Sequence, residues 1–394
     1  IIKKINLILN ISKFIRIYVF LNAFFIKVHS GILIAEFLNI MTEYSLSICV
    51  PSKRTLEESK ASISSAIGFC DSTGSELVVS DNSGNKEKSA MWNKIPLPFM
   101  KYLETCDKDT SKWSDNWFEG IKNCSGKFIG VLSDDDILVN IEKSVIDYKE
   151  ISAPDIVGVK PIISLWASDP GIYKLNKYNI DGNTALERVK QYQFAAGGNN
   201  TTYYSFFRGD ILKNIYQLLK FHPTKGGYID WAITLACLAS GKVLVDGTKL
   251  LVYKNNNWYG NTDFINKQSL KLYTDCGLGE AGFHMSFLFR ALDVFILIMR
   301  KNSNLPIDEK LEAAEFMLNS NLEAFINEIN NNNKKGFYSK KVIDAVSNIN
   351  LEESIELKLK KSLDILKIKF PSNLAADYKI FYENSIGYSW GDFY

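Results

Sequence analysis

Histidine and closely paired cysteine are what this sequence has least of. It contains three histidines, His29, His222 and His284, which are too widely spaced to suggest a histidine metal cluster. Its six cysteines are scattered, and none forms a Cys-x-x-Cys pair. Structural zinc sites and disulfide frameworks both use recurring cysteine spacings. Neither is therefore indicated, and the sequence fits a reducing compartment, so we expect a cytoplasmic protein.

An excess of charge of one sign is also absent. The formal net charge of the 394 residues is +2, which gives no reason to expect nucleic acid as a partner. Residues 283–299 are strongly apolar, but this segment includes Arg290 and Asp293. It is also shorter than the roughly 20 residues that a transmembrane helix needs. We therefore expect a packed helix there.

The first 40 residues contain no methionine and differ in composition from the remainder. Isoleucine, leucine, phenylalanine, asparagine and lysine dominate them, and Met41 then opens a segment that looks like a natural start. We interpret residues 1–40 as an N-terminal extension. An upstream translation artefact is the favoured origin, with a membrane-surface helix and a signal sequence as alternatives. We further predict an α/β domain over residues 41–257 and a helical region over residues 258–394.

The segment from residue 45 to residue 138 alternates between two kinds of pattern. Three segments rich in β-forming residues predict buried strands: 45–51, 76–80 and 128–132. Two segments with apolar residues at helical spacing predict helices: 56–69 and 114–124. This alternation predicts a mostly parallel sheet flanked by helices, in which ligands bind outside the carboxyl ends of the strands. Three polar segments that follow strands are therefore expected to converge: 51–54, 81–84 and 134–136.

Three consecutive aspartates, Asp134, Asp135 and Asp136, follow the third predicted strand directly. Carboxylates this close repel one another, and burying them without a partner is costly. A cation removes that conflict, and Mg²⁺ is usually held by one or two carboxylates together with substrate phosphates. We therefore expect a site for Mg²⁺ or Mn²⁺ and a diphosphate. A solvated acidic turn is the alternative interpretation.

Three motifs carry a family resemblance. They are Ser-Ile-Cys-Val-Pro-Ser at 47–52, Glu-Leu-Val-Val-Ser-Asp-Asn-Ser at 76–83, and Gly-Lys-Phe-Ile-Gly-Val-Leu-Ser-Asp-Asp-Asp at 126–136. In this order they resemble family 2 glycosyltransferases with the GT-A fold, closest in style to bacterial enzymes of O-antigen and capsule assembly. The resemblance is strong to about residue 138, weaker to about residue 252, and absent beyond. It implies a nucleotide-sugar donor, most often a UDP-sugar, and a glycan or lipid-linked saccharide acceptor.

The resemblance also implies roles for residues that bind the donor. Pro51 and Ser52 would line the nucleotide pocket, with Arg54 in the same segment. Asp81 would hydrogen-bond the base, which is usually uracil in this family. Asn116 falls where the family often has an asparagine near the donor.

The acidic motif departs from the family pattern. Relatives commonly have Asp-x-Asp-Asp, and Ser133 occupies the first of these positions here. We expect Asp135 as the main metal ligand, Asp134 as a contact to the ribose or a second metal, and Asp136 as a further ligand. His284 is a candidate third ligand, because an imidazole plays that role in some GT-A enzymes. The division of work among the three aspartates stays open.

Asp230 stands just before a predicted helix at residues 232–239. In the family, the catalytic base belongs to an acidic motif, often Glu-Asp, at the start of this helix. Ile229 replaces the first acid, so Asp230 alone is the candidate base. Aspartate also suits a helix N-cap, and a purely capping role is the alternative. Upstream, residues 194–208 combine glycine, polar and aromatic residues, which suits either carbohydrate contact or a loop before a strand.

Residues 168–183 are rich in turn-forming residues and predict a surface insertion, whereas the region after residue 258 looks helical. Three segments predict helices there: 264–273, 307–328 and 351–370. We expect this region to shape the acceptor site or to mediate a homodimer. The last of these segments carries a group of lysines: Lys358, Lys360, Lys361, Lys367 and Lys369. They form either a solvated face, which we favour, or a peripheral contact with anionic lipid on the inner face of the plasma membrane.

The leading functional hypothesis is an inverting, metal-dependent glycosyltransferase of bacterial surface polysaccharide biosynthesis. A nucleotidyltransferase with the same sheet would usually carry a glycine-rich loop after the first strand, and residues 51–54 contain no glycine. A degenerate, non-catalytic sugar- or nucleotide-binding domain is the third hypothesis. It is suggested by Ser133 and Ile229 at positions that are usually acidic.

Overall fold

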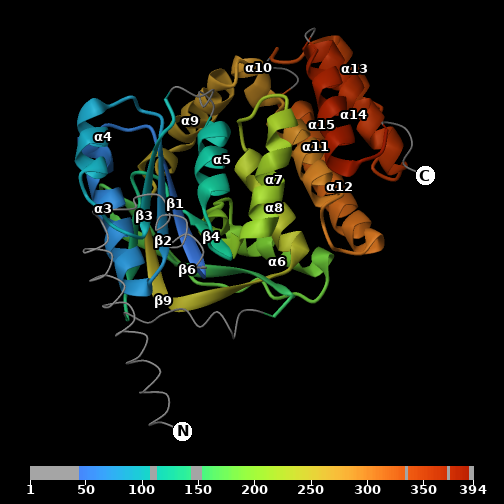
Figure 1. Ribbon diagram of the computed structural model, residues 1–394. Helices are drawn as coiled ribbons and strands as arrows, with labels where there is room; N and C mark the ends of the chain where they lie inside the picture. Colours follow the sequence, from blue (N-terminus) through green and yellow to red (C-terminus); the bar gives the residue numbers. More distant parts are fainter. Residues whose placement is uncertain (1–43, 107–112, 143–152, 333–335, 371–372, 390–394) are drawn as a thin grey trace, which may run out of the picture. The chain divides into compact units, whose positions relative to one another are not determined.

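The computed structural model describes residues 44–106, 113–142, 153–332, 336–370 and 373–389 (Figure 1). Residues from Ser45 to Tyr394 form one compact unit. The interpretation of residues 1–40 lies outside the described residues. All six cysteines fall within the described ranges, and no disulfide joins any two of them there.

A single mixed sheet runs through this unit. The described residues contribute these strands: β1 (Leu46–Ser52), β2 (Glu76–Asp81), β3 (Met100–Glu104), β4 (Phe128–Val131), β5 (Ile137–Asn140), β6 (Ile156–Ala167), β7 (Gly171–Asn176), β8 (Phe206–Arg208) and β9 (Lys242–Lys254). Their order is β3-β2-β1-β4-β8-β6-β9-β5, and β7 pairs with β6. Strands β3, β2, β1 and β4 are parallel to one another, and β6 is parallel to β9. Strand β8 lies between β4 and β6 and runs antiparallel to both.

Helices cover both faces of the parallel part because alternate strand residues are apolar on both sides. Ile48 and Val50 of β1 pack with α3 (Leu56–Thr73), whereas Cys49 packs on the side of α5 (Trp113–Asn123). Every residue of β1, β2 and β4 is buried, as expected for strands with helices on both faces. The predicted α/β class, a mostly parallel sheet flanked by helices with further helices at the C-terminus, is confirmed and is consistent with a GT-A-like fold.

The remaining described α-helices are α4 (Lys86–Asn93), α6 (Ala185–Ala196), α7 (Gly209–Leu218), α8 (Ile229–Ser240), α9 (Thr262–Asp275), α10 (Gly279–His284), α11 (Ser286–Ile298), α12 (Ile307–Asn332), α13 (Lys340–Ser347), α14 (Ile355–Lys369) and α15 (Leu374–Ile386). The apolar segment 283–299 forms the end of α10 and α11, and α11 is buried along most of its length. None of the described helices is both long and apolar enough to cross a membrane. Figure 1 shows α11 to α15 gathered beside α8, opposite the side of the sheet that carries α3 and α4.

One hydrophobic cluster joins the sheet to these C-terminal helices. It contains Ile121 of α5, Leu235 of α8, Phe295 of α11 and Phe381 of α15. The predicted boundary between residues 257 and 258 stays a prediction, and the apolar core runs across it without a break at α8 and α11.

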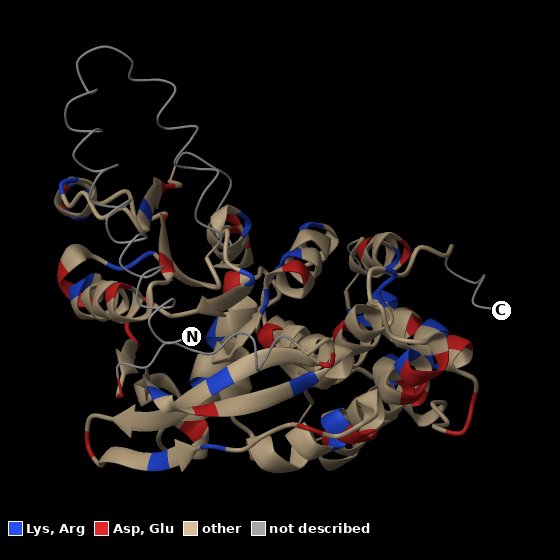
Figure 2. Ribbon diagram, turned by 60° about the horizontal axis from the view of Figure 1, so that its bottom comes forward, with Lys and Arg blue, Asp and Glu red and all other residues tan. Residues whose placement is uncertain are grey.

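Two predictions about the surface need correction. The segment 168–183 is not only an insertion of turns, because β7 within it pairs antiparallel with β6. The lysines of α14 do not all form one basic face, because Lys358 is buried and pairs with Glu315 at 2.9 Å. Lys361 pairs with Glu353 at 2.6 Å. Figure 2 shows acidic and basic residues interspersed on the C-terminal helices.

Candidate functional site

Asp134, which follows β4, is hydrogen-bonded to the residues at the end of β1. Its Oδ2 accepts hydrogen bonds from the Ser52 hydroxyl (2.7 Å) and from the backbone N–H groups of Lys53 and Arg54 (3.0 Å each). Its Oδ1 pairs with the Arg54 guanidinium. Burial acts to raise the pKa of the Asp134 carboxyl, but the bonds from the Arg54 amide and the Ser52 hydroxyl lower it below its usual value. Asp134 is therefore held as a carboxylate by the chain itself.

Asp135 and Asp136 have different surroundings. The Asp135 carboxylate bonds Arg54 at 2.7 Å and remains 25% exposed. Asp136 is fully buried; its Oδ1 accepts the Lys254 N–H at 2.8 Å, and its Oδ2 has no hydrogen-bond partner in the described part of the chain. Burial raises the pKa of both groups, and the neighbouring Asp135 charge adds to the effect on Asp136.

A buried ion pair between Lys88 and Asp81 supports the ends of β1 and β2 beside these aspartates. Lys88 of α4 is completely buried and donates to Asp81 Oδ1 (3.0 Å), Ser52 Oγ (2.6 Å) and the Arg54 carbonyl (2.9 Å). Tyr102 of β3 donates to the other Asp81 oxygen. Asp81 and Ser52 therefore belong to an internal network that fixes the ends of β1 and β2, a role that the sequence did not indicate for Lys88.

A cavity of about 730 Å³ opens at the carboxyl ends of β1, β2 and β4. Its basic lining residues are Lys53, Arg54, Lys225, Lys254 and Lys271. Its aromatic lining residues are Trp113, Trp117, Tyr204, Tyr253 and Trp258. Asp134, Asp135 and Asp275 supply the carboxylates. The volume and the mixture of aromatic walls with convergent charges are typical of a site for a small ligand.

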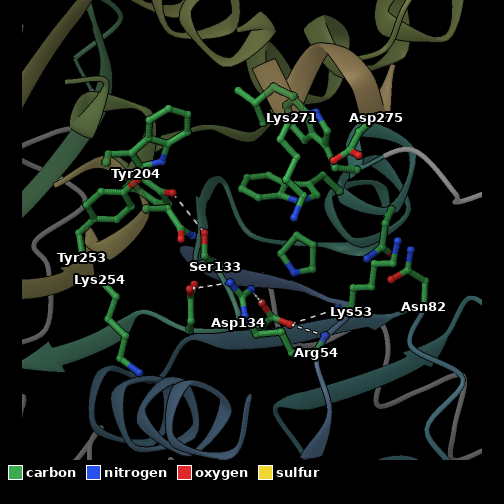
Figure 3. A pocket seen from close by; sticks show the side chains of 18 of the residues that line it. Lys53, Arg54, Asn82, Ser133, Asp134, Tyr204, Tyr253, Lys254, Lys271 and Asp275 are labelled. Atoms are coloured by element: carbon green, nitrogen blue, oxygen red, sulfur yellow. Dashed lines mark hydrogen bonds and ion pairs between the residues drawn. The ribbon is translucent and has the colours of Figure 1, made fainter. Parts of the chain in front are cut away.

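The cavity lies between the sheet and α9. Figure 3 shows Lys271 and Asp275 of α9 across the cavity from Arg54 and Asp134, with Tyr204 on the same wall as Tyr253. The polar segments 51–54, 81–84 and 134–136 thus converge as predicted, and the helical C-terminal region closes the opposite side. No sequence pattern indicates a role for Lys271, since its place in the cavity depends on how α9 packs.

The predicted donor-binding residues differ in their access to the cavity. Pro51, Arg54 and Asn116 line it, whereas Asn82 lines it in place of the neighbouring Asp81. The Asn116 amide is itself engaged, because it accepts from the Ser80 hydroxyl at 2.8 Å and donates to the Ser80 carbonyl at 3.1 Å. Asn116 therefore shapes the floor of the cavity.

Asp230 lies in the first turn of α8, and the prediction that it occupies the N-cap is wrong. The helix begins at Ile229, so Tyr228 is the N-cap residue. The Asp230 carboxylate instead accepts a hydrogen bond from Asn200 Nδ2 at 2.7 Å. Burial raises the pKa of Asp230, opposed by this bond and by the positive charge of Arg290.

Asp230 does not appear in the described lining of the cavity. Its charge nevertheless acts on Tyr253, which lines the cavity. Burial, then the charges of Asp136 and Asp230, raise the pKa of Tyr253. Asn200, which precedes the short 3₁₀ helix Thr201–Tyr204, was not singled out from the sequence, although it lies inside the unusual segment 194–208.

His284 occupies a different part of the fold. It is the last residue of α10, and its ring stacks on Phe337 with centroids 4.4 Å apart. Its nearest described carboxylate partner is Glu280, at 3.7 Å. The structure does not bring it into the described lining of the cavity, so it is not assembled with the three aspartates.

The donor set at the end of β4 fits a divalent cation that takes a single protein carboxylate. Asp134 and Asp135 both line the cavity, but both oxygens of Asp134 are bonded within the chain, whereas Asp135 pairs with Arg54 through one oxygen, Oδ2. Within the described residues no group of three or more His, Cys, Asp or Glu could hold a metal by itself. Mg²⁺ and Mn²⁺ complete their shells with phosphate oxygens and water, so Asp135 suffices if a ligand supplies phosphates.

Comparisons with known proteins found distant structural matches. No known family model matches this chain, and no curated protein matches it. Among solved structures, a crystal structure of S. aureus TarS 1–349 is 13% identical, covers 86% of this chain and 89% of that chain, and has a TM-score of 0.45. The same protein in complex with UDP-GlcNAc is 13% identical over 86% and 87% of the two chains, with a TM-score of 0.42. The mannosyltransferase PcManGT from Pyrobaculum calidifontis, in complex with GDP-Man and Mn²⁺, is 11% identical over 87% and 88%, with a TM-score of 0.38.

Proposed function

We propose that this protein is a glycosyltransferase that moves a sugar from a nucleotide-diphosphate donor to a hydroxyl of a glycan or lipid-linked saccharide, in bacterial surface polysaccharide biosynthesis. The observation that carries the proposal is the cavity itself. It brings a carboxylate that can hold a cation, five basic side chains and five aromatic rings to the carboxyl ends of parallel strands. A negatively charged ligand with a flat base and a sugar matches such a lining.

The donor would lie across the ends of β1 and β4. Lys53, Arg54 and Lys254 supply positive charge for its diphosphate, and Asn82 offers an amide to the base on the side of β2. A UDP-sugar is the expected donor, and the base contact expected of Asp81 would require that carboxylate to be shared with Lys88. The acceptor would enter from the side of α9.

Asp135 would hold Mg²⁺ or Mn²⁺, and Asp136 is adjacent to it. The bound cation would neutralise the charge that develops on the diphosphate when the glycosidic bond breaks. Asp134 would keep Arg54 in place beside this charge, because both of its oxygens are bonded to the segment Ser52–Arg54.

Asp230 is the proposed general base, with inversion at the anomeric carbon. It would take the proton of the acceptor hydroxyl while that oxygen attacks from the face opposite the diphosphate. Its raised pKa makes it a stronger base than an exposed aspartate, and the bond from Asn200 fixes its direction.

A donor panel tests the proposal. Purified protein with Mn²⁺ should release nucleoside diphosphate from at least one UDP-sugar or related nucleotide sugar, slowly with water and faster with a saccharide acceptor. Asp210 of α7 offers a matched control, because it is exposed and lies in the first turn of its helix, as Asp230 does in α8. Asp210→Asn should keep the activity that Asp230→Asn loses. Release of pyrophosphate from a nucleoside triphosphate and a sugar phosphate would instead indicate a nucleotidyltransferase, and binding without turnover would indicate a non-catalytic domain.

A further inference from the structure

Lys225 has a backbone conformation that the other described non-glycine residues avoid. Its φ angle is +51°, the one positive value among them. In this left-handed region a side chain crowds its own backbone. The next two residues are glycines that the packing requires: a Cβ on Gly226 would lie 2.1 Å from the Cys276 sulfur, and Gly227 has φ +67°. A lysine at this position, where glycine would relieve the strain, is a reason to ask what its side chain contacts.

The Lys225 side chain is directed to the cavity rather than to the interior. It lines the cavity, and its Nζ lies 3.1 Å from Asp115 Oδ1 in the first turn of α5. Both members of this pair are partly exposed, at 28% and 20%. Ion pairs with such exposure contribute little, so the ammonium group can exchange Asp115 for an anionic ligand at small cost.

A buried histidine–aspartate pair holds the Lys225 backbone. The N–H groups of Lys225 (2.9 Å) and Thr224 (3.3 Å) both donate to His222 Nδ1. The proton of the neutral ring is therefore on Nε2, which donates to Asp293 Oδ1 at 2.9 Å. Asp293, on α11, also accepts from the Tyr378 hydroxyl of α15 at 3.0 Å.

We infer that Lys225 binds a phosphate group of the ligand in this cavity, and that His222 and Asp293 are positioning residues that hold its strained backbone there. The C-terminal helices thus act on the Lys225 loop through the hydrogen bond between His222 and Asp293 of α11. The claim that Lys225 binds a phosphate group rests on the proposed function. The claim that His222 and Asp293 position the Lys225 backbone does not.

Binding of two probes tests the role of the charge. UDP with Mn²⁺ and inorganic pyrophosphate would each be titrated into the unaltered protein and into Lys225→Met, Lys225→Gly and Lys225→Arg. Loss of a charge-assisted contact to phosphate should weaken binding by about tenfold to a hundredfold in the first two variants, and Lys225→Arg should retain most of the affinity. Lys220→Met is the matched control, because Lys220 is exposed on the preceding 3₁₀ helix and lies outside the cavity lining.

The backbone is tested without any ligand. Lys225→Gly and Lys225→Met remove the same charge, but only glycine accepts a positive φ without crowding. The glycine variant should therefore have the higher midpoint of thermal unfolding, although both bind the probes equally weakly. A lower midpoint for Lys225→Gly than for Lys225→Met would contradict the claim that the Lys225 backbone is strained.

A double-mutant cycle tests the positioning role. If His222 acts through Lys225, His222→Leu should weaken probe binding in the unaltered protein and cause no further loss in Lys225→Met. Should His222→Leu fail to fold, His222→Asn replaces it, since the asparagine oxygen can still accept the Lys225 N–H while its contact with Asp293 is lost; a smaller loss is then expected. Equal losses in both backgrounds would make His222 a merely structural residue and overturn this part.

Two outcomes separate the inference from the proposed function. If the unaltered protein binds UDP and Lys225→Met binds it equally well, the inference fails and the proposed function stands. If the unaltered protein binds neither probe, the proposed function fails together with the phosphate assigned to Lys225, and the comparison of glycine with methionine still decides the backbone claim.

Discussion

At the scale of single residues, the proposed transfer reaction depends most on Asp230. Its carboxylate is partly buried, accepts a hydrogen bond from Asn200 and lies in the electrostatic field of Arg290. Because its pKa is raised in the folded protein, folding is favoured at low pH, and that contribution is lost as the pH rises through the folded pKa. At neutral pH a neutral isostere should therefore cost no stability.

Asp230→Asn should lower transfer by roughly 10²–10⁴-fold, the range typical of losing a general base. Its free energy of unfolding at neutral pH should be unchanged or slightly higher, since asparagine removes a partly buried charge and keeps the shape. Rate assays and denaturant unfolding of the variant, with Asp210→Asn beside it, measure both quantities. A near-normal transfer rate would remove Asp230 from the mechanism.

Asn200 should set the pH at which Asp230 becomes active. Its N–H stabilises the ionised carboxylate, so Asn200→Ala should raise the pKa of Asp230 further and move the acid limb of the rate profile to higher pH. Arg290, the other group that favours the charged form, is unchanged in this variant. The neighbouring Asn199→Ala serves as the control. If the acid limb of the rate profile lies at the same pH in Asn200→Ala as in the control, Asn200 does not set the pKa of Asp230.

At the scale of elements, the patterns that predicted β1, β2 and β4 succeeded because all three strands are buried on both faces. The same patterns also predicted α3 and α5 within a few residues. They missed β7, which pairs with β6. Its apolar residues Ile172 and Leu175 are exposed, so the strand lacks the alternation of buried apolar and exposed polar residues by which a strand is recognised. The N-cap expected at Asp230 failed because α8 begins at Ile229, which makes Tyr228 the N-cap residue.

The entry into β4 should tolerate no side chain at Gly126. A Cβ there would lie 2.4 Å from the Ser47 backbone nitrogen, and Gly126 N–H already donates to the Ser47 hydroxyl. Gly126→Ala should destabilise the protein by about 1–3 kcal/mol or more, the range for overpacking. Gly68, exposed within α3, is the contrast, because a Cβ added there would meet open space. Gly68→Ala should stabilise the protein by about 0.5–1 kcal/mol. Denaturant midpoints that shift in the same direction would contradict this packing.

At the scale of the whole molecule, the site depends on the C-terminal helices, which the sequence placed only loosely. Lys271 and Asp275 reach the cavity from α9, and Asp293 reaches the Lys225 loop from α11. None of these residues belongs to a motif, because their roles follow from packing between segments far apart in the chain. The motifs at strand ends, by contrast, are local and could be interpreted from the sequence.

A chain that ends at residue 257 should therefore fail to fold. It would lose α11, whose side chains Leu292, Phe295 and Ile296 are buried in the same cluster as α8. Each large apolar side chain contributes about 1.5–3 kcal/mol on burial, so a helix of them outweighs a typical net stability of about 5–15 kcal/mol. A chain that begins at Met41 and runs to the end is the control, since the compact unit begins at Ser45. A soluble, cooperatively unfolding product from residues 41–257 would contradict the shared core.

The central claim is that the cavity holds a nucleoside diphosphate through a cation on Asp135. Calorimetric titration of UDP, with Mn²⁺ and then with a chelator, into the unaltered protein and Asp135→Asn tests it most directly. We expect UDP to bind the unaltered protein more tightly with Mn²⁺ than with the chelator, and Asp135→Asn to show no difference between the two conditions. Equal affinity of the unaltered protein in both conditions would contradict the metal, and no binding of UDP or any other nucleoside diphosphate would contradict the site.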